Sequence, residues 1–381
     1  LAHVGFWTHS SLVLIFLNIL PFSKHFHIIT SFPNVFTRNL PPHGRLEPVA
    51  TSSEALMAKV EKAFEAPAEA EPVGIAKITD FSWKAILDFY TCTECGRCSD
   101  NCPAHKTGKI LSPKVLTINL RDHLYQHAEE LIAHNAAGPQ PPPPEGEEPP
   151  PPSPALADLA GNVIHPDVLW ACTTCRACEE QCPVLISYVD KIIDMRRNLV
   201  LIKGEMPAQL SAPLSALDVN GNPWNLARVD RGAWSEGLDI PLMRDNPGAK
   251  VLYWVGCAGS YDDRAKKVAR ATAQLMKEAG VEFAILGDEE TCTGDPARRA
   301  GDEYRFIALA EQNAATLNGY KEQGGIATIV TTCPHCFNTL ANEYPDFGAK
   351  FEVIHHADYL AKLVKSGKLK PKGNVGERVA Y

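Results

Sequence analysis

The sequence has no excess of basic residues and no long basic run. Its 381 residues include 37 Lys and Arg against 45 Asp and Glu, which gives a formal net charge of −8. Because a nucleic-acid-binding protein presents a basic surface, nucleic acid is disfavoured as a partner. The chain is also too long to be a small secreted domain held together by disulfides, and its length suffices for two or three domains with cores of their own.

Charged residues are absent between Val4 and Phe22, and acidic residues are absent from the first 45 positions. The uncharged stretch is long enough to cross a hydrocarbon layer of about 30 Å. A signal peptide would need basic residues before the apolar run, whereas Lys24, Arg38 and Arg45 all follow it. By the positive-inside tendency, we expect a cell-membrane protein whose remaining chain lies on the cytoplasmic side.

Two histidines flank this apolar stretch. His9 and His27 are 27 − 9 = 18 residues apart, or about five turns, so a continuous helix would present both on one side. Such a pair can ligate two stacked b-type haems, although Pro21 can kink the helix, and both residues can instead be packed or interfacial. The segment resembles the last helix of nitrate-reductase gamma-type cytochrome b domains, which implies haem b ligation in a complete protein.

The twelve cysteines fall into three groups of four, and the first two groups repeat one motif, Cys-x2-Cys-x2-Cys-x3-Cys-Pro. In two-cluster ferredoxins, the fourth cysteine of each such motif ligates the other cluster. Zinc is the alternative, but a tetrahedral ion needs only four sulfurs and not this pattern used twice. We therefore predict two [4Fe–4S] clusters, one bound by Cys92, Cys95, Cys98 and Cys182 and the other by Cys172, Cys175, Cys178 and Cys102.

Helical patterns accompany both motifs. Asp80 and Asp167 are expected to cap helices over 81–90 and 168–171, and a further helix is expected over 185–201. These patterns predict an all-helical ferredoxin domain. The Pro-rich insert 138–155 is expected to be an extended surface loop, with a ligand for a polyproline-binding domain as the alternative.

Strands and helices alternate in the C-terminal third. Strands are expected at 251–255, 281–286, 326–331 and 351–354, and helices at 262–279, 296–318 and 358–365. This order predicts an α/β domain with a parallel sheet, whose sites form at the carboxyl ends of the strands. The third group of cysteines follows three of these strands, at Cys257, Cys292, Cys333 and Cys336.

The pattern resembles the cysteine-rich CCG domain of heterodisulfide reductases, except that Thr293 stands where the second cysteine of Cys-Cys-Gly would be. The four sulfurs that remain are expected to bind a third [4Fe–4S] cluster, with zinc as the alternative. Arg298 and Arg299 can bind an anionic partner or balance charge near the surface. His355 and His356 end the fourth strand on the same edge, where they can approach the cysteines or simply pack.

The whole chain resembles the membrane-bound iron–sulfur oxidoreductases that join a nitrate-reductase gamma-type cytochrome b to a part like the cysteine-rich subunit of heterodisulfide reductase. The family carries more cytochrome helices and a second cysteine-rich domain, so the resemblance implies a fragment. The predicted parts are the last cytochrome b transmembrane helix (1–47), a linker (48–79), the ferredoxin domain (80–210), a second linker (211–248) and a first, truncated CCG domain (249–381).

Residues 292–299, Cys-Thr-Gly-Asp-Pro-Ala-Arg-Arg, resemble the branch of this family that links electron-transfer flavoprotein to menaquinone. The resemblance implies that electrons enter at the cysteine-rich domain, pass through the ferredoxin clusters, and reach haem b and menaquinone in the membrane. The alternatives are a thiol–disulfide oxidoreductase like heterodisulfide reductase and a non-catalytic electron-wiring subunit. No side chain is assigned as a catalytic acid, base or nucleophile.

Overall fold

The structure, a computed structural model, describes residues 1–40, 42–67, 69–138 and 153–373, so most of the Pro-rich insert lies outside the described residues. The chain forms two compact units. The first comprises Leu1–Pro41, Met57–Glu205 and Arg299–Gly301, and the second comprises Pro42–Leu56, Met206–Arg298 and Asp302–Tyr381. Residues 211–248, which were expected to be a linker, belong to the second unit. Trp234 and Leu238 of this segment are buried in the core of that unit.

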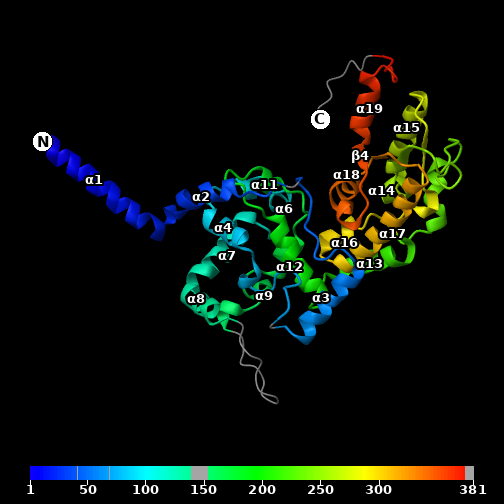
Figure 1. Cartoon of the computed structure of the whole chain (residues 1–381). Helices are drawn as coiled ribbons and strands as arrows, with labels where there is room; N and C mark the ends of the chain where they lie inside the picture. The colour runs from blue at the N-terminus through cyan, green and yellow to red at the C-terminus, as the bar shows by residue number, and fades with distance from the viewer. Residues whose placement is uncertain (41, 68, 139–152, 374–381) are drawn as a thin grey trace. The chain divides into compact units, whose positions relative to one another are not determined.

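The chain begins with the apolar helix α1 (Ala2–Ile19), none of whose residues is buried, and α1 extends away from the other helices of its unit (Figure 1). Within the described ranges, Ala2–Phe22 is the one helical stretch long and apolar enough to cross a membrane. Two short 3-10 turns, Leu20–Phe22 and Lys24–Phe26, separate it from α2 (His27–Phe36).

His9 and His27 do not lie on one continuous helix, in line with the kink considered at Pro21. Ser23 has an extended backbone (φ −117°, ψ 165°), so the two histidines lie on different helices. The reason is Pro21, which lacks the N–H that an α-helix needs and whose ring crowds the preceding turn.

The ferredoxin part of the first unit is helical, as predicted. Its longer helices are α4 (Trp83–Thr91), α7 (Pro113–Gln126), α8 (Ala128–Ala137) and α12 (Val189–Leu201), while α3 (Ser53–Glu65) has its first four residues in the second unit. Its one-turn helices are α5 (Arg97–Asp100), α6 (Pro103–Lys106), α9 (Leu159–Asn162), α10 (Pro166–Trp170) and α11 (Ala177–Glu180). The core of this unit includes Phe89, Leu120, Leu169 and Ile192.

The helix starts differ slightly from the predicted ones. The Ser82 hydroxyl, and not Asp80, accepts a hydrogen bond from the first turn of α4, at the Ala85 N–H. Asp80 instead accepts hydrogen bonds from the backbone N–H groups of Ala76 and Lys77, upstream of α4. His165 caps α10 in place of Asp167.

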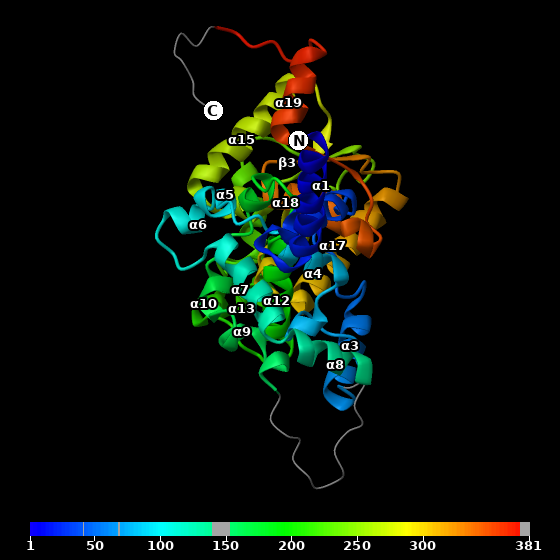
Figure 2. The same cartoon turned by 90° about the vertical axis from the view of Figure 1, so that its left-hand side faces the viewer.

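The second unit contains the predicted parallel sheet. Its strands are β1 (Val251–Trp254), β2 (Phe283–Ala284), β3 (Thr328–Thr331) and β4 (Glu352–His355), in the order β2-β1-β3-β4. The helices of this unit are α13 (Ala208–Asn220), α14 (Gly256–Tyr261), α15 (Asp263–Glu278), α16 (Asp295–Ala300), α17 (Glu303–Glu322), α18 (Pro334–Asn338) and α19 (His356–Lys365). Helices α15 and α19 lie side by side (Figure 2). The predicted helix over 296–318 is split at Gly301, whose φ of +86° ends α16.

A buried ion cluster joins three segments of the second unit. The guanidinium of Arg298 is fully buried and lies 3.0 Å from Glu343 Oε2 and 3.3 Å from Glu303 Oε1, both of which are fully buried as well. It also donates a hydrogen bond to the Leu46 carbonyl at 3.0 Å. Arg298 therefore fastens the segment around Leu46 to α16 and α17. A role for this side chain in binding an external anionic partner does not fit its burial.

Replacing Arg298 with methionine is expected to destabilise the second unit by about 3–5 kcal/mol, because two buried carboxylates lose their cation. The matched control is Arg244→Met, which removes an exposed ion pair to Asp288 and is expected to change stability by about 1 kcal/mol or less. Calorimetric unfolding of both variants measures the difference, and equal losses would refute this role for Arg298.

Candidate functional site: three groups of cysteines

The first cysteine motif surrounds a cavity that is partly open to solvent and has about 250 Å³ of empty space. Backbone residues in the left-handed region, Glu94 (φ 57°) and Gly96 (φ 83°), turn the chain tightly between the cysteines. Tyr188 and Lys114 complete the wall. The cysteines that line this cavity, named here the Cys92 site, are Cys92, Cys95, Cys98 and Cys182.

The second motif surrounds a cavity of about 300 Å³ in the same way. Its left-handed residues, Thr174 (φ 57°) and Arg176 (φ 58°), hold the positions of Glu94 and Gly96 in the first motif. The cysteines that line this cavity, named the Cys172 site, are Cys172, Cys175, Cys178 and Cys102. The structure therefore places the fourth cysteine of each motif at the cavity of the other motif.

Arg176 stands where the first motif has a glycine, and the left-handed conformation is unfavourable for a residue with a Cβ. Two ion pairs hold Arg176 in place, to Glu179 Oε2 and to Asp190 Oδ1, each at 2.6 Å. Burial alone would lower the pKa of Arg176, but Asp190 and Glu179 raise it above its ordinary value. The strained turn at the Cys172 site is therefore stabilised by these charge-assisted contacts.

Burial dominates the chemistry of the thiols. It raises the pKa of Cys92 to about 11 and raises that of Cys178 further. Because a metal ligand must be a thiolate, binding at either site has to displace protons. Backbone N–H groups already point at two sulfurs, from Thr174 to Cys172 Sγ and from Ile186 to Cys182 Sγ, both at 3.4 Å. Such bonds stabilise charge on a sulfur ligand.

The third group, named the Cys257 site, lies at the carboxyl edge of the sheet. Cys257 lies in the first turn of α14, just after β1, Cys292 follows β2, and Cys333 and Cys336 follow β3. Gly256 is needed beside them, because its φ is +76° and an added Cβ would lie 3.2 Å from Cys336 Sγ. Thr293, the residue that replaces a cysteine of the CCG pattern, directs its hydroxyl at Cys336 Sγ at 3.9 Å.

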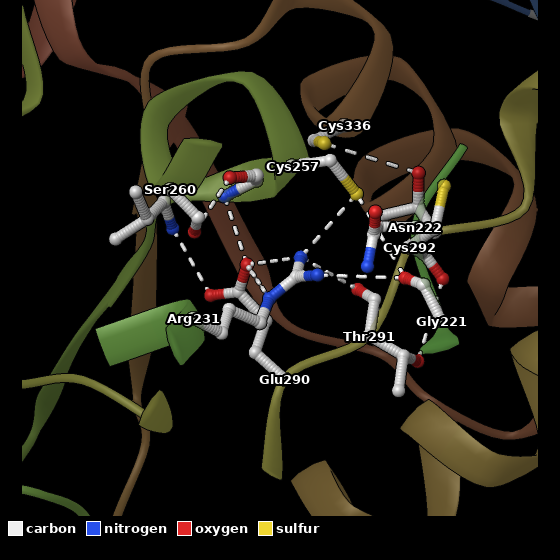
Figure 3. Close-up of polar contacts among 12 residues, drawn as sticks. Gly221, Asn222, Arg231, Cys257, Ser260, Glu290, Thr291, Cys292 and Cys336 are labelled. Atoms are coloured by element: carbon white, nitrogen blue, oxygen red, sulfur yellow. Dashed lines mark hydrogen bonds and ion pairs between the residues drawn. The ribbon is translucent and has the colours of Figure 1, made fainter. Parts of the chain in front are cut away.

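A buried arginine approaches this site, as Figure 3 shows. Arg231 Nη2 lies 3.5 Å from Cys257 Sγ and donates hydrogen bonds to Glu290 Oε1 at 2.8 Å and to the Thr291 carbonyl at 3.2 Å. The Arg231 and Glu290 side chains are only 1% and 2% exposed. A hydrogen bond from Cys292 and the charge of Arg231 lower the pKa of Cys257, against the effect of burial.

Glu290 links this arginine to the turn that carries Cys257. Its two carboxylate oxygens accept hydrogen bonds from the N–H groups of Val255 at 3.1 Å and Gly256 at 2.8 Å. Sequence reasoning missed both residues. Arg231 lies in the segment taken for a linker, and neither it nor Glu290 belongs to a spaced motif, so only the folded chain brings them to the cysteines.

The predicted histidines lie elsewhere or make other contacts. His355 Nε2 contacts the Thr332 carbonyl at 3.2 Å, and its ring packs against His356. The histidine that contacts a site sulfur is instead His335, whose Nδ1 lies 4.0 Å from Cys333 Sγ. His9 lies on α1 and His27 begins α2, so the structure does not bring this pair together on one helix.

At the Cys92 and Cys172 sites, the donor sets fit iron–sulfur clusters better than single ions. Among the described residues, no three Cys, His, Asp or Glu side chains come close enough to hold one metal ion. Four sulfurs instead border a cavity at the Cys92 site and at the Cys172 site. A four-iron cube needs thiolates spread around such a space, whereas a zinc ion draws its four ligands to within about 2.3 Å of one point.

Two family models match the chain. Residues 91–186 match a 4Fe-4S dicluster domain, and residues 251–341 match the CCG cysteine-rich domain. These matches confirm the predicted ferredoxin and cysteine-rich domains. No solved structure matches the chain.

Curated relatives match nearly the whole chain. A probable iron-sulfur-binding oxidoreductase, FadF, from Bacillus subtilis is 38% identical over 100% of this chain and 54% of its own length. The EtfAB:quinone oxidoreductase of Syntrophomonas wolfei is 37% identical over 98% of this chain and 51% of its own length. A probable membrane-anchored ferredoxin from Chromohalobacter salexigens is 38% identical over 81% of this chain and 46% of its own length. The chain spans about half the length of these relatives.

Proposed function

We propose that the chain is an iron–sulfur oxidoreductase of the kind that joins a 4Fe-4S dicluster domain to a CCG cysteine-rich domain, and that it carries electrons from electron-transfer flavoprotein to menaquinone. The observation that carries this proposal is the pair of cavities, each lined by three thiols of one motif and the fourth of the other. The name of the Syntrophomonas relative supports the choice of donor and of a quinone as acceptor.

We assign one [4Fe–4S] cluster to the Cys92 site and one to the Cys172 site. When bound, such a cluster accepts and releases one electron at a time. The protein supplies the thiolates, the N–H groups directed at sulfur, and the walls around each site. Tyr188 is one such wall residue at the Cys92 site, and burial raises the pKa of its hydroxyl far above the ordinary value, so that it remains a neutral group.

At the Cys257 site we propose a third [4Fe–4S] cluster, with zinc as the alternative. Four thiols without the fifth of the full CCG pattern suit a cubane. The guanidinium of Arg231, 3.5 Å from Cys257 Sγ, balances part of the negative charge that a thiolate-bound cluster brings into a buried place.

The apolar helix α1 and the membrane-anchored relative support membrane association. We propose that the cysteine sites lie on the cytoplasmic side, in line with the basic residues that follow the helix. Haem b remains part of the proposal for the complete protein. His9 and His27 would each need a second axial ligand from another helix, because the resemblance assigns them to two different haems.

Membranes that contain the full-length protein are expected to reduce menaquinone when supplied with reduced electron-transfer flavoprotein. The Cys257 site itself is expected to turn over no disulfide substrate, because Thr293 replaces a thiolate of the heterodisulfide reductase pattern in this cysteine-rich domain. Membranes from cells that lack the protein provide the background. Disulfide turnover without flavoprotein-dependent quinone reduction would favour the thiol–disulfide alternative. Activity that requires a separate catalytic subunit would favour a wiring role.

A further inference from the structure

Helix α2 is amphipathic with the unusual feature that its polar face is turned inward. Thr30 and Asn34 are its buried residues. Its large apolar residues are exposed to solvent, with Phe32 80% exposed and Phe36 83% exposed; the others are Ile28, Ile29 and Val35. A helix packed on a soluble domain normally buries its apolar face. The exposed face of α2, defined by these five residues, therefore needs an apolar neighbour outside the ferredoxin helices.

The polar face of α2 holds the chain on both sides of the Cys92 site. Thr30 donates a hydrogen bond to the Tyr90 carbonyl at 3.3 Å, two residues before Cys92. Asn34 donates one to the Val184 carbonyl at 2.9 Å, two residues after Cys182. The Phe26 ring also packs edge-on against the Tyr90 ring, with centroids 5.8 Å apart. Of the two ferredoxin cavities, α2 is thus attached to the flanks of the Cys92 site.

A buried charge network makes this attachment rigid. Lys84 donates to Asn34 Oδ1 at 2.8 Å and to Asp88 Oδ1 at 2.7 Å. Asp88 is almost fully buried and also accepts from Lys191 on α12 at 2.5 Å. Burial alone would raise the pKa of Asp88, but the two lysines lower it below its usual range. Because the carboxylate stays charged and paired, α2, α4 and α12 are joined by strong contacts.

The surroundings of α2 in the chain identify its missing neighbour. The membrane-span candidate ends at Phe22, five residues before α2 begins at His27. Lys24 precedes α2 and Arg38 follows it, while no acidic residue occurs before Glu47. An exposed apolar face, cationic residues at both ends, and direct continuity with a spanning segment are the features of a helix that lies in the membrane interface.

We propose that α2 lies flat in the boundary between lipid headgroups and acyl chains, with its exposed apolar face in the lipid and its polar face on the ferredoxin helices. This arrangement seats the Cys92 site next to the membrane and the Cys172 site behind it. The lipid contact does not depend on the identity of the electron donor. The consequence that the Cys92 cluster exchanges electrons with the membrane acceptor rests on the proposed function.

Photo-crosslinking identifies the neighbour of α2. Phe32 is replaced with benzoylphenylalanine in the full-length protein, in vesicles of phosphatidylethanolamine and phosphatidylglycerol. Ile132, 69% exposed on α8 of the same unit, receives the same replacement as the control. We expect phospholipid adducts at position 32 and not at position 132. Adducts of position 32 with another protein segment, or equal lipid yields at both positions, would overturn the proposal.

The order of the clusters is tested by adding gadolinium-chelating lipid to the same vesicles and measuring the spin relaxation of the reduced clusters. Cys95→Ser and Cys175→Ser identify the two signals, because each variant alters one site. The signal changed by Cys95→Ser is expected to relax faster near gadolinium than the signal changed by Cys175→Ser. Equal or reversed enhancement would overturn the order. Neither readout uses flavoprotein or quinone turnover, so a wrong donor would leave both results intact.

Discussion

Replacing Cys182 with alanine is expected to abolish the cluster at the Cys92 site and to leave the one at the Cys172 site. Cys182 belongs to the second motif along the chain, but its side chain lines the cavity of the first. Chemical analysis should show a loss of about four irons and four sulfides per chain. The electron paramagnetic resonance signal that disappears should be the one that Cys95→Ala also removes.

The reciprocal variant, Cys102→Ala, is the matched control, since Cys102 lines the cavity at the Cys172 site. It should remove the signal that Cys175→Ala removes. If Cys182→Ala and Cys175→Ala instead removed the same signal, each motif would bind its own cluster. The crossed assignment, and with it the interpretation of the two cavities, would then be wrong.

Replacing Glu290 with alanine is expected to abolish metal binding at the Cys257 site. The change leaves the Arg231 guanidinium buried without its carboxylate, and it frees the N–H groups of Val255 and Gly256 that position the turn of Cys257. Breaking a buried ion pair from one side costs about 3–5 kcal/mol. The iron, sulfide and zinc content of the protein should fall only by the amount bound at the Cys257 site. The electron paramagnetic resonance signals of both ferredoxin clusters should persist.

Two comparison variants make this prediction specific. Asp288→Ala, two residues away, removes an ion pair to Arg244 that is largely exposed and should leave the metal content unchanged. The double variant Arg231→Met with Glu290→Leu removes both charges and should be more stable than Glu290→Ala, since no charge is left buried alone. Unchanged metal content in Glu290→Ala would contradict the role of the pair. Loss of zinc without loss of sulfide would assign zinc to the site.

The parts of the fold that were predicted correctly depend on periodicity. The repeated motif predicts which eight cysteines share a cluster, because a [4Fe–4S] cube fixes how far apart its thiolates can be along the chain, and the structure places these cysteines around two cavities. Alternation of apolar strands with helices predicts a parallel sheet, and its strands lie within two residues of the expected ones. Because sites form at the carboxyl ends of parallel strands, the third cysteine group is expected to lie together at that edge of the sheet.

The features that were missed depend on contacts between distant segments. Arg231 carries no local pattern and is 290 − 231 = 59 positions from Glu290, so its role appears only when 211–248 packs into the second unit. The sequence around Arg298 suggests an exposed side chain that can bind an anionic partner. In the structure, however, this side chain is buried against Glu303 and Glu343. The inward polar face of α2 follows from the packing of α2 on α4, which periodicity alone does not reveal.

The central claim is that electrons pass from a flavoprotein through the cysteine sites to a quinone. The most direct measurement mixes oxidised full-length protein, in vesicles that contain menaquinone, with reduced electron-transfer flavoprotein and freezes samples at increasing times for electron paramagnetic resonance. The account predicts that cluster signals appear first and then decline as menaquinone is reduced. Clusters that stay oxidised in the presence of reduced flavoprotein, or reduced clusters that menaquinone does not reoxidise, would contradict it.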